Sequence, residues 1–108
     1  MNDDIHTLAI PAFIFDPDSL CIIDANNRTL ELYGYSLSEI KAMKIHELRP
    51  VERRQEVLKL IESTRGHVLY AGEAIHQKKN GEQMPVYVYG KKILFDNKEL
   101  YLIKIKVK

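Results

Sequence analysis

The segment from residue 68 to residue 107 most constrains the fold, because it predicts strands joined by tight turns. Asn80-Gly81 is the dipeptide most typical of a two-residue turn between twisted antiparallel strands. Asp96-Asn97 predicts a second tight turn. We therefore expect a three-stranded meander, with strands over residues 68–77, 83–95 and 99–107.

Alternating side chains along the meander form two rows on each strand, and the sequence alone does not say which row faces the core. On the closing strand Lys104 and Lys106 predict a solvated face, which they share with Leu100 and Leu102. These leucines are candidates for contact with another protomer or a flanking helix, although isolated exposed leucines are also ordinary on protein surfaces. The opposite row of that strand is Tyr101, Ile103, Ile105 and Val107. On the long strand the two rows are Pro85, Tyr87 and Tyr89 against Met84, Val86 and Val88.

A first hairpin is predicted near the N-terminus, with strands over residues 9–15 and 20–24 around the Asp-Pro-Asp-Ser turn at 16–19. Pairing this hairpin with the meander makes a five-stranded antiparallel sheet. The helices between them then have only that sheet against which to bury their apolar stripes. The predicted fold class is α+β, with short helices and one longer helix packed on one face of the sheet. We expect one domain over residues 1–108, with residues 1–8 as an N-terminal lead-in.

Helix boundaries are marked by capping residues. Asn26 or Asn27 caps a first helix that ends at Gly34. Ser36 and Glu39 have the spacing of a capping box at the start of a second helix. A short turn over residues 46–48 precedes Pro50, and the longest helix is expected over 51–64, ending at Gly66.

Composition excludes several classes of protein. The 16 basic and 15 acidic residues leave a net charge near +1, which argues against a nucleic-acid partner because phosphate binding needs a basic excess on one surface. No apolar run approaches the roughly 20 residues that cross a bilayer, so we expect no membrane insertion. The single cysteine, Cys21, and an acidic N-terminus without a signal peptide favour a cytoplasmic location.

No pattern predicts catalysis or metal binding. The histidines His6, His46, His67 and His76 lack metal-ligand spacing and have no cysteine pair beside them. The acidic residues are explained by turns and caps, and no phosphate-binding glycine loop or serine elbow is present. We expect no catalytic residues, no metal site and no enzyme activity in this domain itself.

Several residues, in this order and spacing, resemble the PAS domain family. Its second strand ends in Asp-x-Asn, which Asp24 and Asn26 match. Its Gly-Tyr-Ser step and Glu-Leu pair correspond to residues 34–36 and 39–40, and its Pro-x-acid step to 50–52. Its meander has Glu and then Lys-Asp-Gly, which Glu73 and residues 79–81 match. The resemblance covers residues 5–107.

Two departures from the family pattern stand out. Arg28 occupies a position where the family often has a small residue, and the chain stops at Lys108 before the family's usual exit into a signalling helix. We therefore expect a fragment cut at a domain boundary, with its C-terminal output module outside this chain.

The resemblance also bears on cofactors. Haem-binding members use a histidine on the long helix, and residues 51–64 contain none; His46 lies before that segment and His67 after it. Flavin-binding photosensor members carry a reactive cysteine beside the third helix, whereas Cys21 lies on the predicted second strand. No cofactor is evident, and haem and flavin are both disfavoured.

The function implied by the resemblance is sensory. It implies a regulatory domain of a signalling protein, with a two-component sensor histidine kinase as the first expectation and a cyclic-dinucleotide enzyme or transcription regulator as alternatives. A small ligand or a partner would shift the conformation, and a homodimer or a flanking signalling helix is expected. In this family the short helices wall a cavity; the candidate ligand-binding residues are Leu30, Tyr33, Leu58, Ile61, Ile75, Tyr87 and Ile103.

An alternative remains open. The same residues are consistent with a ligand-free dimerisation or protein-interaction module, whose helices are capped around a core that its own side chains fill.

Overall fold

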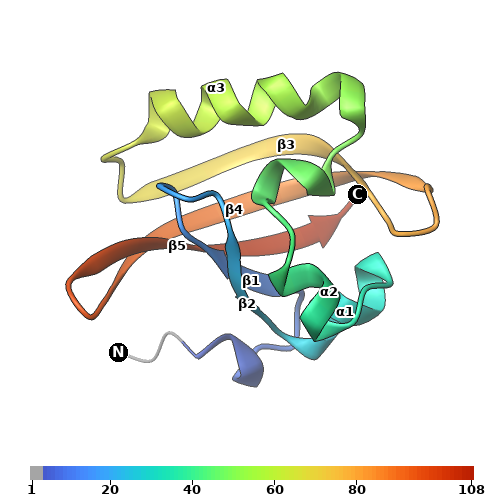
Figure 1. The fold of residues 1–108 in the computed structure, drawn as a ribbon, viewed down its shortest axis with the longest axis horizontal. Helices are drawn as coiled ribbons and strands as arrows, with labels where there is room; N and C mark the ends of the chain where they lie inside the picture. Colours follow the sequence, from blue (N-terminus) through green and yellow to red (C-terminus); the bar gives the residue numbers. More distant parts are fainter. Residues whose placement is uncertain (1–3) are drawn as a thin grey trace.

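Five strands form one antiparallel sheet in the order β2-β1-β5-β4-β3 (Figure 1). The structure is a computed structural model that describes residues 4–108. Every neighbouring pair of strands is antiparallel, which confirms the predicted sheet. The strands are β1 (Ala12–Phe15), β2 (Ile22–Ala25), β3 (Leu69–Gln77), β4 (Gln83–Phe95) and β5 (Lys98–Val107).

The tight turn between β4 and β5 has the geometry that its sequence predicts. Asp96 has φ 50° and Asn97 has φ 62°. Two successive left-handed residues make the type I′ turn that matches strand twist, and Asp and Asn adopt this conformation more readily than most residues. The turn aligns Phe95 with Lys98 and so sets the register of the longest strand pair.

Three α-helices and three 3₁₀ helices complete the part of the chain that the structure describes. Asn26 is the N-cap of α1, and Gly34 (φ 83°) ends it in the left-handed conformation. Ser36 and Glu39 form the predicted capping box at α2. The predicted long helix begins as a 3₁₀ turn and becomes α-helical at Arg54. The helices are η1 (Ile5–Thr7), α1 (Asn27–Tyr33), α2 (Leu37–Lys41), η2 (Ile45–Leu48), η3 (Val51–Arg53) and α3 (Arg54–Thr64).

One face of the sheet, called here the inner face, is covered by α1, α2, η2 and α3. In Figure 1 α3 runs alongside β3, while α1 and α2 lie together at the other side of the molecule. Met84, Val86 and Val88 of β4 are buried on the inner face. Tyr87 and Tyr89 are 37% and 46% exposed, which decides the orientation that the sequence left open.

The opposite, outer face carries a second apolar cluster under the N-terminal segment. Ile5 of η1 packs with Ala12, Ile93, Leu100 and Leu102. Leu100 is 7% and Leu102 is 4% exposed, so the expectation that these leucines are free for another protomer or helix is wrong. Residues 4–8 of this chain's own lead-in cover them; residues 1–3 of the expected lead-in lie outside the described residues.

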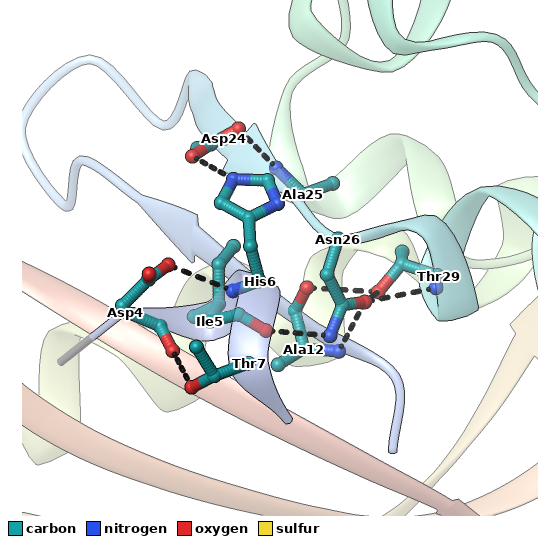
Figure 2. Close-up of polar contacts among 9 residues, drawn as sticks. All are labelled: Asp4, Ile5, His6, Thr7, Ala12, Asp24, Ala25, Asn26 and Thr29. Atoms are coloured by element: carbon teal, nitrogen blue, oxygen red, sulfur yellow. Dashed lines mark hydrogen bonds and ion pairs between the residues drawn. The ribbon is translucent and has the colours of Figure 1, made fainter. Parts of the chain in front are cut away.

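Asn26 joins this lead-in to the sheet and to α1 (Figure 2). Its Nδ2 donates to the carbonyls of Ile5 and Ile10 at 2.9 and 2.8 Å. Its Oδ1 accepts from the backbone N–H of Ala12 at 3.1 Å and of Thr29 at 3.0 Å. One buried amide therefore satisfies four backbone groups from three segments.

A histidine–carboxylate contact holds η1 from its other side. Nε2 of His6 lies 2.8 Å from Oδ2 of Asp24 at the end of β2 (Figure 2). Both side chains are exposed enough that this contact adds little to folding stability.

None of the helices within residues 4–108 is long and apolar enough to span a bilayer.

Candidate functional site

A small cavity lies between α3 and the inner face of the sheet. Its volume is about 70 Å³. Val57, Leu60 and Ile61 of α3 line one side, while the central strands line the other. The apolar residues from the sheet are Phe13, Phe15, Val88, Tyr101 and Ile103. The cavity is therefore closed by the longest helix of the domain.

Arg49, which follows η2, brings a cation to this cavity. The residue is 7% exposed, and its Nε has no hydrogen-bond partner. Burial lowers the pKa of its guanidinium, which remains charged because arginine starts so high. The charge of Glu56 acts to raise the pKa of Arg49, but the carboxylate of Glu56 pairs with Arg53 at 3.5 Å. Within residues 4–108 no carboxylate forms an ion pair with Arg49.

A buried tyrosine–histidine pair lies beside the cation. The hydroxyl of Tyr33 is 2.6 Å from Nδ1 of His76, a residue that lines the cavity. Burial, and then the charge of Arg49, lower the pKa of His76 to about 3, and burial raises the pKa of Tyr33. Both groups are therefore neutral at pH 7. Which of the two atoms donates depends on the imidazole tautomer: when the imidazole proton lies on Nε2, the phenol donates to Nδ1.

Tyr70 reaches the cavity because Gly72 leaves room for its ring. A Cβ at Gly72 would lie 2.7 Å from Cζ of Tyr70 and closer still to the hydroxyl. Tyr70 and Gly72 share the inner face of β3 with Ala74 and His76. Two small residues between two ring side chains thus give the phenol its position.

Gly72→Ala is expected to displace this ring and lower the free energy of unfolding by about 1–3 kcal/mol, as overpacking does. Chemical denaturation measures the change. In a Tyr70→Leu background the same substitution should be neutral or stabilising, because alanine is favoured over glycine in a strand. An equal cost in both backgrounds would show that the ring does not depend on Gly72.

The predicted site residues divide into two groups. Ile61 and Ile103 line the cavity, and Tyr33 reaches it through His76. Leu30, Leu58 and Ile75 are half-buried but are not among the lining residues, and Tyr87 lies on the outer face with the Lys108 ammonium 5.0 Å from its ring centroid.

Sequence reasoning missed Arg49, Tyr70 and His76. The row of Tyr70, Gly72, Ala74 and His76 held a usable signal, because small residues between large ones on one strand face leave space. No local signal marks Arg49, since its burial depends on α3 packing against the sheet.

The helices that were expected to wall the cavity lie elsewhere. Among the described residues, those of α1 and α2 do not line it; Tyr33 and Ile40 are instead fully buried in the core. Around α1 and α2 the core is therefore filled by the domain's own side chains, as the alternative interpretation expects. The cavity is lined instead by residues of α3 and η2. Within residues 4–108 no group of three His, Cys, Asp or Glu side chains is placed to hold a metal ion.

The sequence matches a family profile described as "PAS domain" over residues 11–105. No curated protein sequence matches the chain. The match covers β1 to β4, all but the last two residues of β5, and the whole of the cavity lining.

Solved structures share the fold at low sequence identity. A PAS domain from Desulfitobacterium hafniense has a TM-score of 0.86 at 17% identity and covers 99% of this chain and 100% of that one. A PAS domain from a two-component sensor histidine kinase has a TM-score of 0.82 at 14% identity, with 96% and 89% coverage. A LOV protein of Rhodobacter sphaeroides has a TM-score of 0.78 at 13% identity, with 94% and 60% coverage.

Proposed function

The chain belongs to the PAS domain family, and from this premise we propose that it senses a small ligand in the cavity between α3 and the sheet. The observation that carries the proposal is the cavity itself, with a buried unpaired cation and a neutral imidazole on its wall. Protein interiors pack with few voids, so a mainly apolar void with a few polar groups on its wall is a candidate ligand site.

The proposed mechanism is a population shift. A ligand in the cavity contacts α3 through Ile61 and the sheet through Ile103 and His76. It therefore stabilises the arrangement in which α3 is closed on the sheet. The ligand shifts the equilibrium between this arrangement and an open one only to the extent that it binds the two with different affinities.

The size of the cavity supports a ligand of a few heavy atoms. Sites for drug-sized ligands occupy about 300–1,000 Å³, whereas this cavity has about 70 Å³. Haem and flavin are both too large for it without rearrangement, and Cys21, on the β2 side of the sheet, is not among the lining residues. We therefore propose a sensor without a resident cofactor.

We propose a cytoplasmic two-component sensor histidine kinase as the host protein, with its catalytic domain outside this chain. A cyclic-dinucleotide enzyme or a transcription regulator is the alternative host. In each case the domain transmits a signal and performs no catalysis. The exposed Tyr87 and Tyr89 offer the outer face to a second protomer or a flanking signalling helix.

Filling the cavity tests the proposal. Native mass spectrometry of the purified domain should show a bound small molecule, and a low-mass extract of the expression host should raise its unfolding temperature. A ligand present at a hundred times its Kd adds about 2.7 kcal/mol of stability. Ile61→Phe should remove both effects.

Ile23→Phe is the matched control, because it makes the same change at a position that is 40% exposed on β2. It should retain ligand and response. If the wild type carries no ligand and responds to no extract, while Ile61→Phe is simply more stable, the domain is the ligand-free interaction module instead.

A further inference from the structure

We propose that the ligand of this cavity is a short-chain monocarboxylate whose negative charge is paired with Arg49. This inference rests on the proposed function, because it names the chemical class of the ligand for the same cavity. A ligand of another class would leave the sensory function intact and would overturn only this assignment.

The buried cation is the first reason. Arginine is almost never this deeply buried without a partner, because removing an ion from water carries a large penalty that only a counter-charge offsets. Arg49 is 7% exposed, its Nε is unpartnered, and no carboxylate of residues 4–108 pairs with it. The missing partner is therefore an anion from outside the described chain.

The charge and the hydrogen-bond donors of the cavity lining are suited to such an anion. None of the described residues that line the cavity is an aspartate or a glutamate. His76 also lines the cavity, and in the tautomer in which Tyr33 donates to Nδ1 its Nε2–H is a second donor. A planar carboxylate suits the fork of N–H groups on a guanidinium, which favours it over a spherical ion.

The apolar part of the lining suits a short alkyl chain. Phe13, Val88 and Ile103 are apolar and buried. The volume of about 70 Å³ limits the ligand to a few heavy atoms. The hydroxyl of Thr64 already donates to the carbonyl of Leu60 at 2.7 Å, so this residue does not compete for the carboxylate as a donor.

The test compares three compounds on the purified domain at pH 7: sodium propionate, its neutral isostere propionamide, and sodium chloride at the same ionic strength. Propionate should raise the unfolding temperature in a saturable way, and the other two should not. In a ¹H–¹⁵N spectrum, propionate should also shift the Nε–H signal of Arg49. This second measurement needs no variant.

Variants at Arg49 give the matched controls. Arg49→Met should abolish the response to propionate. The ligand-free domain should be as stable as the wild type or more so, because the substitution removes a buried charge that has no counter-ion in the absence of ligand. Arg49→Lys keeps the charge but loses the fork, so the affinity for propionate should fall about tenfold.

Five outcomes overturn the assignment. Equal stabilisation by propionamide and propionate contradicts the ion pair, and so does an unchanged propionate response in Arg49→Met. Chloride as effective as propionate contradicts the carboxylate. If an extract of the expression host stabilises the domain and propionate does not, the carboxylate class is wrong and the sensory function stands. If neither stabilises it, both proposals fail.

Discussion

Asn26→Ala is expected to lower the free energy of unfolding by about 3–5 kcal/mol, because one substitution removes a helix cap and leaves several buried backbone groups unpaired. The N–H of Ala12 loses its contact with Oδ1, and the carbonyls of Ile5 and Ile10 lose their donor. The N–H of Thr29 loses the cap of α1. Urea denaturation followed by circular dichroism measures the change.

Two variants separate the parts of this effect. Asn26→Asp keeps the oxygen that caps α1 but has no N–H to offer Ile5 and Ile10. It should be intermediate in stability and should expose the backbone of residues 5–10 to hydrogen exchange. Asn27→Ala changes the exposed neighbour at the first position of α1 and should stay within about 0.5 kcal/mol of the wild type. A similar loss in Asn26→Ala and Asn27→Ala would contradict the role assigned to Asn26.

Acid is expected to destabilise the domain through His76. Its pKa is about 3 in the folded state against 6.5 for the free side chain. The unfolded chain therefore binds the proton first, so the contribution of neutral His76 is complete above pH 6.5 and is lost progressively toward pH 3. In this window stability should fall by up to about 1.4 kcal/mol per pH unit.

In the upper part of that pH window, the effect of His76 on stability can be measured apart from the effects of the carboxylates. The pKa values of Asp16, Asp18 and Glu39 are lowered in the fold, Glu39 to about 2 by its contacts with Lys79 and the backbone of Ser36. These carboxylates contribute stability above their unfolded pKa values near 4 and lose it only below them. Between pH 6.5 and pH 5 the loss should therefore come from histidine.

His76→Gln should flatten the stability profile between pH 6.5 and pH 5, even if it lowers stability at every pH. His67→Gln alters the exposed histidine that follows α3 and should keep the wild-type slope. Urea unfolding at several pH values compares the three proteins. The same slope in His76→Gln and the wild type would show that His76 is not buried as a neutral group.

Local chemistry explains why so much of the fold was predictable. The turn at Asp96-Asn97, the cap at Asn26 and the capping box of Ser36 and Glu39 each depend on residues within a few positions of one another. Their hydrogen bonds join near neighbours in the chain, so the local sequence favours them before any tertiary contact forms. The five-stranded sheet then followed from pairing the first hairpin with the meander, whereas its strand order came from the structure.

The candidate site was only partly predictable, because its members are distant in sequence. Ile61 and Ile103 were found as apolar residues on faces that the period of each element predicts to be inward. Arg49 and His76 look like ordinary polar residues in the sequence, and their burial appears only when α3 closes over the strands. Leu100 and Leu102 show the converse, since η1 covers a face that the lysines of β5 predict to be solvated.

By itself the sequence determined the strands, the turns, the helix caps and the family resemblance, since hydrogen bonds and steric preferences between near neighbours specify them. The tertiary structure alone decided which row of β4 is buried, where the cavity lies and which cation it encloses. The physical reason is that burial and desolvation are properties of surroundings assembled from distant segments, and no stretch of sequence contains its own surroundings.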